Sequence, residues 1–303
     1  MQNSKLIHLL QSLSKPELNK LEEYIYSPYF NKNQNVRALF DILYKSYPKF
    51  KDEEITRNIV YNQIFSTDQY DEQKLRYLMS DLTKLIENFL MDQQMADFPH
   101  FQNHVLLLQF QKRNLIKYSQ ATIEQSNALQ TKNKYLNADY YLNQFTIEVD
   151  NYEYVSMKRN VAIKENLLEI IRNLDIYYII NKLKYSCEII NHTNVWAGEY
   201  DPLLLEEIII YLKKNKHDHI PAVAIYYQIL MTLLKSDEED HYLQLKQLLK
   251  DNIKILPQEE LNDMYIFARN YCVKKINSGK INYLKELLDL YKVLLQNGII
   301  LQN

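Results

Sequence analysis

The stretch Ile220–Lys235, with the sequence IPAVAIYYQILMTLLK, most constrains the fold, because its periodicity is that of a helix buried over most of its circumference. Apolar side chains recur at intervals of three and four residues on two sides of this helix. Only Gln228, Thr232 and Lys235 interrupt them. A helix with two apolar faces and one thin polar stripe needs neighbours on both sides. The stretch therefore predicts a layered stack of helices with this helix in the middle.

Helical periodicity also runs through most of the remaining chain, and glycine is almost absent. The chain has three glycines in 303 residues, and two of them, Gly279 and Gly298, stand beside expected helix ends. So few glycines leave little material for phosphate-binding loops or tight hairpin turns. The expected fold is all-α, and nucleotide-binding loops are excluded.

A break at Asp97, Phe98, Pro99 and His100 divides the chain into an N-terminal helical bundle, residues 1–97, and a second region, residues 98–303. In the bundle we expect five helices, near residues 4–12, 14–26, 36–44, 53–65 and 71–95. The second region opens with two long helices, 105–129 and 136–157, and then continues as helix pairs. These pairs are 174–191 with 202–214, 222–235 with 238–252, and 259–276 with 281–296.

A short aromatic element recurs in the first helix of each pair. It reads IYYI at 176–179, IYYQ at 225–228 and MYIF at 264–267, with DYYL at 139–142 as an earlier copy. Helix pairs that recur at such spacing are typical of an α-solenoid, because one pair cannot bury its own apolar face. Over roughly residues 136–295 the chain resembles tetratricopeptide-type repeats, which implies an irregular α-solenoid of stacked helix pairs. No binding residue is carried over, because the family's glycine, tyrosine and closing proline are not at their expected spacing.

A second resemblance covers three short stretches. SPYFNKN at 27–33, KLRYLMSDLTKLIENFL at 74–90 and RNYC at 269–272 are similar to uncharacterised all-helical proteins common in Bacteroidota. That resemblance implies no activity.

Charge, cysteine content and hydropathy exclude several classes of protein. The 36 basic side chains nearly balance the 38 acidic ones, so a dedicated nucleic-acid binder is not expected.

Cys187 and Cys272 have neither disulfide-framework nor zinc-ligand spacing, and we expect both to be reduced core residues. No window reaches the ~20 apolar residues that span a bilayer, and the start MQNSKLIHLL lacks the features of a signal peptide. We therefore expect a cytoplasmic protein that does not enter the membrane.

The 26 tyrosines allow two interpretations. Tyrosine is enriched on amphipathic binding surfaces, so the excess favours a protein-binding role. Alternatively, a codon bias toward Tyr, Asn, Lys and Ile raises all of them together without a functional reason.

Metal and catalytic sites find little support in the sequence. His100 and His104 have the spacing of two metal ligands on one helix face, but no acidic residue lies between them and no third ligand is indicated. Solvated histidines at a helix start are the alternative. Basic side chains gather around His217 and His219. Capping of a helix C-terminus, where positive charge is favourable, is a simpler interpretation of this group than anion binding. Because no catalytic motif is present, we expect no enzyme and no cofactor.

The main functional hypothesis is a non-enzymatic adaptor or scaffold that binds a protein or peptide on the inner face of the solenoid. In a stacked array the first helices of successive pairs line that face, and each here carries polar side chains among apolar rows. We expect the following exposed residues to contact the partner: Asn181, Lys184, Gln228, Thr232, Arg269 and Asn270. The alternative is that these are ordinary solvated positions.

The alternative is a transcription regulator in which the helices at 53–65 and 74–90 form a winged-helix-like DNA-binding pair ahead of a tetratricopeptide-like effector region. Between Asp71 and Asp92, three basic residues stand against five acidic ones. A recognition helix with this charge gains no affinity from counterion release, so nucleic-acid binding is not the favoured hypothesis.

Overall fold

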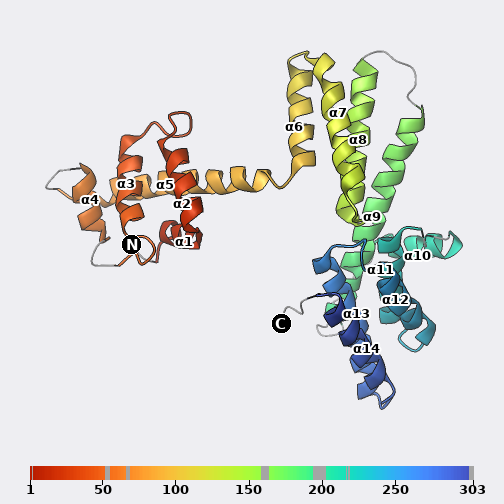
Figure 1. Ribbon diagram of the computed structural model, residues 1–303. Coiled ribbons are helices and arrows are strands. Elements are labelled where there is room, and N and C mark those ends of the chain that lie inside the picture. The colour runs from red at the N-terminus through yellow and green to blue at the C-terminus, as the bar shows by residue number, and fades with distance from the viewer. Residues whose placement is uncertain are drawn as a thin grey trace. The chain divides into compact units, whose positions relative to one another are not determined.

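The protein is built almost entirely from helices. The computed structural model describes residue 1 and residues 3–51, 55–65, 69–157, 164–193, 203–215, 217 and 219–299. These residues form fourteen α-helices and one short 3-10 helix, with no strand among them, which confirms the all-α prediction (Figure 1). The chain forms two compact units, Met1–Gln102 and Asn103–Asn303. The boundary expected after residue 97 lies shortly before the division between them.

The first unit is a bundle assembled on one long helix. Its helices are α1 (Lys5–Ser12), α2 (Lys15–Tyr26), α3 (Gln34–Lys45), α4 (Arg57–Phe65) and α5 (Glu72–Met95). Helix α5 packs against the other four. Its buried side chains recur at intervals of three and four residues and so form one apolar face: Leu75, Leu78, Met79, Leu82, Ile86 and Phe89. The expected helix start at residue 53 lies outside the described residues.

Helix α2 begins at a capping box, formed by Ser14 and Glu17 at the spacing typical of that motif. Ser14 Oγ accepts a 3.4 Å hydrogen bond from the Glu17 backbone N–H, and the Glu17 carboxylate accepts a 2.7 Å bond from the Ser14 N–H. Each residue thereby satisfies a backbone donor that the first turn of a helix leaves free.

The rest of the chain supplies the helices of the second unit. Helix α6 (Pro99–Lys112) begins in the last residues of the first unit and continues into the second. The others are η1 (Ile116–Tyr118), α7 (Ser119–Lys132), α8 (Ala138–Met157), α9 (Lys164–Thr193), α10 (Leu205–Lys214), α11 (Pro221–Leu234), α12 (Glu239–Asp251), α13 (Gln258–Asn277) and α14 (Tyr283–Gln296). From α10 onward these bounds follow the predicted helix pairs closely. The expected helix start at residue 202 lies outside the described residues.

The single helix predicted at residues 105–129 is wrong, because the chain breaks between α6 and η1. Asn114 has a φ of +56°, a left-handed conformation that asparagine tolerates better than most residues. The Leu115 N–H donates a 2.8 Å bond to the Phe110 carbonyl, which closes the end of α6. This turn depends on a single backbone angle, and the apolar periodicity on either side does not reveal it.

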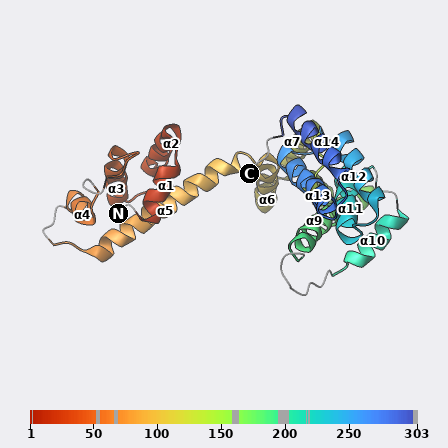
Figure 2. The same ribbon diagram turned by 90° about the horizontal axis from the view of Figure 1, so that it is seen from below.

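Helix α11 occupies the centre of the second unit, as its sequence predicts. It packs against α9, α12 and α13, and Figure 2 shows it among these helices. Ile225, Ile229 and Leu230 are completely buried, and most other side chains of α11 are also buried. The pairs α11–α12 and α13–α14 pack internally, while α12 also packs against α13.

Candidate binding surface

The six side chains predicted to bind a partner come from three neighbouring helices. They are distributed as Asn181 and Lys184 on α9, Gln228 and Thr232 on α11, and Arg269 and Asn270 on α13. Because α11 packs against both α9 and α13, these three helices form one layer. Within that layer the six side chains have different surroundings.

Gln228 is buried, so its expected exposure is wrong. Its side-chain amide donates a 2.7 Å bond to the Gln244 carbonyl oxygen, and its own oxygen lies 2.8 Å from His241 Nδ1. On the other side of the imidazole, His241 Nε2 lies 3.3 Å from the Glu238 carboxylate. Gln228 is therefore held by α12, whose polar side chains offset the cost of burying an amide.

The expected exposure of Thr232 is also wrong. Its side chain is 4% exposed, and its hydroxyl donates a 2.7 Å bond to the Ile229 carbonyl of the same helix. A threonine can be buried in a helix because this local bond satisfies its hydroxyl.

The other four residues reach solvent to different extents. Asn270 is exposed, and Asn181, Lys184 and Arg269 are half-buried. The Arg269 guanidinium lies 5.4 Å from the centre of the Tyr291 ring, a cation–π contact within its own unit. Asn181 donates a 2.9 Å bond to the Tyr177 carbonyl.

A groove of about 390 Å³ crosses the layer of α9, α11 and α13, and we call it the layer groove. It is lined by Asn191 of α9, Thr232 and Leu233 of α11, and Phe267, Asn270, Tyr271 and Lys274 of α13. Two of the six predicted residues, Thr232 and Asn270, thus line the same groove. Its lining combines apolar surface with amide groups and one amine.

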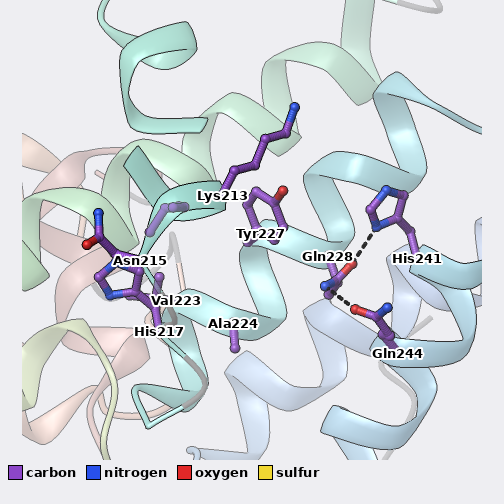
Figure 3. A pocket seen from close by; sticks show the side chains of 10 residues that line it. Lys213, Asn215, His217, Val223, Ala224, Tyr227, Gln228, His241 and Gln244 are labelled. Atoms are coloured by element: carbon purple, nitrogen blue, oxygen red, sulfur yellow. Dashed lines mark hydrogen bonds between the residues drawn. The ribbon is translucent and has the colours of Figure 1, made fainter. Parts of the chain in front are cut away.

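A second hollow, of about 290 Å³, lies where α11 and α12 meet the end of α10. Figure 3 shows Gln228 hydrogen-bonded between His241 and Gln244, with Asn215 and His217 at the opposite side. Lys213 also lines the hollow. Amide, imidazole and amine groups can hydrogen-bond a polar side chain, but the hollow contributes a single candidate residue, Gln228.

The sequence-based prediction missed His241, Gln244 and Lys274. His241 stands three residues after Glu238 at the start of a helix, a spacing that signals a local pair but not its contact with α11. Lys274 follows Asn270 by four residues and so shares its helix face. That spacing is a signal from which the sequence could have identified it.

The two histidines with metal-ligand spacing have other surroundings. His104 Nδ1 lies 2.8 Å from an Asp150 carboxylate oxygen. His100 is half-buried, and burial lowers its pKa. Burial raises the pKa of Asp150, while the His104 hydrogen bond opposes that change. Among the residues that the structure describes, no group of three or more His, Cys, Asp or Glu side chains is placed to hold a metal ion.

Both cysteines are free, buried thiols. Burial raises the pKa of Cys187 and of Cys272, so neither forms a thiolate readily. The predicted core positions of both cysteines are confirmed.

None of the described helices has the length and apolar character required to cross a bilayer. Comparison of the chain with protein-family models, with curated proteins and with solved structures finds no match. The two resemblances noted in the sequence therefore stay predictions.

Proposed function

We propose that this protein is a non-enzymatic, cytoplasmic adaptor or scaffold whose C-terminal region binds a protein segment. The proposal includes an irregular, tetratricopeptide-like α-solenoid, supported by the packing of α9 on α11, of α11 on α13 and of α12 on α13. The layer groove is the observation that carries the proposal, because three successive first helices contribute to it.

The chemistry of the layer groove suits an extended polypeptide. An extended segment presents unpaired backbone N–H and C=O groups, and a side-chain amide can both donate to and accept from such groups. Asn191 and Asn270 supply amides, and the Lys274 amine supplies a further donor. Phe267 and Leu233 offer apolar surface between them. A few placed polar groups on an apolar lining are typical of a recognition site.

Selection of peptides from a displayed random library tests this function directly. We expect a family of peptides that binds the full-length protein and loses about tenfold or more in affinity on Asn270→Ala combined with Lys274→Ala. Both side chains are exposed, so the melting temperature should change little. Lys285→Ala is the matched control, because Lys285 is an exposed lysine of α14 outside the groove lining.

Two results would contradict the proposal. One is a library that yields no binder. The other is a set of binders whose affinity is unchanged in the double variant, which would place recognition elsewhere on the surface.

A transcription regulator is the second candidate function, and the packing of α4 against α5 favours it. The basic side chains of this pair, however, are partly engaged within the protein. Arg57 forms an ion pair with Glu72, and the Lys74 amine lies 4.0 Å from the centre of the Phe65 ring. These contacts compete with phosphate binding, so the adaptor is the better-supported function.

A further inference from the structure

Helix α9 has two mainly apolar rows on opposite sides, and among the residues that the structure describes only one of these rows is covered. The inner row packs against the rest of the second unit and is buried: Asn173, Ile176, Ile180, Leu183 and Cys187. The outer row we call the outer seam: Leu167, Ile171, Leu174, Tyr178, Asn181 and Tyr185. Its five apolar side chains are between 39% and 58% exposed.

The spacing of the outer seam is that of a helix-pairing surface. Its members follow one another at alternating steps of four and three residues, which is the a/d pattern of a coiled coil. At 1.5 Å per residue the seam is about 27 Å long. A soluble helix gains nothing from exposing such a row to water, and contiguous apolar surface of this kind marks an interaction site.

The charges beside the outer seam identify a second copy of the same chain as the occupant. Asp175 and Lys182 flank the seam on one side, seven residues apart. Two turns of helix separate them by about 10 Å, which is too far for an ion pair within α9. Neither side chain has an ion-pair partner among the residues that the structure describes. In a symmetric antiparallel pair of α9 helices, each carboxylate meets the other copy's amine.

We propose that the protein forms a two-fold symmetric dimer in which the α9 helices of two copies pair antiparallel through the part of the outer seam from Leu174 to Tyr185. With the axis between Ile179 and Ile180, Leu174 lies opposite Tyr185 of the second copy. Asp175 lies beside Lys182 of the second copy, and the symmetry makes this ion pair twice.

The same arrangement explains the one polar member of the outer seam. Asn181 lies opposite Tyr178 of the second copy, so the tyrosine hydroxyl can donate to the Asn181 side-chain oxygen. The Asn181 nitrogen already donates to the Tyr177 carbonyl within α9. A polar residue in an apolar seam sets the register of a helix pair at some cost in stability.

Other alignments of the two helices lose the charge pairing. A parallel pair places Asp175 beside Ile170, and Lys182 beside Tyr177. An antiparallel pair shifted by one heptad brings Asp175 against Asp175 of the second copy, and like charges in contact are unfavourable. The antiparallel register about Ile179 and Ile180 is therefore the one that the charges select.

Sedimentation equilibrium of the full-length protein tests the dimer, and charge reversal tests its register. Wild type should show a monomer–dimer equilibrium, and Leu174→Asp should abolish the dimer. Asp175→Lys and Lys182→Asp should each weaken it by roughly tenfold or more, because each sets like charges together. The double reversal should restore the wild-type dissociation constant. Lys285→Asp, an exposed charge reversal on α14, is the matched control and should leave the dimer unchanged.

Circular dichroism of each variant separates lost pairing from lost folding, since all three positions have exposed or half-buried side chains. A wild type that stays monomeric at every accessible concentration overturns the dimer. A dimer that survives Leu174→Asp overturns the seam. Failure of the double reversal to restore association overturns the antiparallel register.

Discussion

Tyrosine side chains serve the core of the second unit as well as its surface. Tyr226, Tyr242 and Tyr265 are among the largest fully buried side chains of the described residues. The Tyr226 hydroxyl donates a 3.0 Å bond to the Glu260 carboxylate, which joins α11 to α13 in a buried position. Burial raises the pKa of Tyr226, and the Glu260 charge raises it further, so the hydroxyl remains a donor. Part of the tyrosine excess is therefore structural.

Removal of this hydroxyl should destabilise the protein. Tyr226→Phe leaves the buried Glu260 carboxylate without its phenolic donor, and an unsatisfied buried polar group costs about 1–3 kcal/mol. We expect the free energy of unfolding, measured in urea, to fall by that amount. Tyr211→Phe is the control, because the Tyr211 side chain is about half exposed and should tolerate the loss. Equal stabilities for the two variants would show that the Glu260 bond contributes nothing.

At the scale of elements, α11 and α9 differ in how their apolar rows are used. Helix α11 has neighbours on both sides, so nearly all its side chains are buried. Helix α9 packs against α8, α10 and α11 and leaves one apolar row in solvent. A helix with two apolar faces can therefore be fully buried, as α11 nearly is, or can leave one face exposed, as α9 does. The number of neighbouring helices decides between these outcomes.

A charge placed in the centre of α11 should disrupt the second unit. Ile229 is completely buried, and Ile229→Asp should cost about 4 kcal/mol or more, a large part of a total stability of about 5–15 kcal/mol. The variant should be insoluble or lose its cooperative thermal transition. Leu234→Asp, at a half-exposed position near the end of the same helix, should remain folded. An unchanged melting temperature for Ile229→Asp would contradict the burial of α11.

At the scale of the whole molecule, two large apolar cores and one small cluster around Leu107, Ile123 and Tyr154 support a chain with almost balanced charge. One core lies within the first unit and a larger one within the second. The excess of acidic over basic side chains is two, so no general electrostatic attraction to nucleic acid is expected.

Fluorescence anisotropy with labelled duplex DNA distinguishes the two candidate functions. We expect no binding tighter than about 1 μM at physiological salt, because few phosphates can be neutralised. The same duplex at low salt is the control, since weak non-specific binding should appear there. Submicromolar affinity for one sequence over others would favour the transcription regulator.

Periodicity alone predicted most of the helices and the buried position of α11. The reason is that apolar side chains at intervals of three and four residues define a helix face wherever the chain packs. The buried face of α5 and the capping box at Ser14 follow from equally local patterns. The exposure of the candidate site residues was less predictable. Polar residues at intervals of three and four indicate an exposed helix face, but they do not show whether a neighbouring helix covers that face.

The sequence by itself determined the helical class, the helix pairs from α11 onward and the helix that lies at the centre of the second unit, whereas α9 begins at Lys164, ten residues before its expected start. Only the tertiary structure decided that Gln228 is buried, because its burial depends on Gln244 and His241 of α12 to satisfy its amide. The tertiary structure likewise decided which apolar row of α9 remains exposed. Such outcomes depend on contacts between distant parts of the chain, and the spacing of residues along one helix does not show which neighbouring side chains cover it.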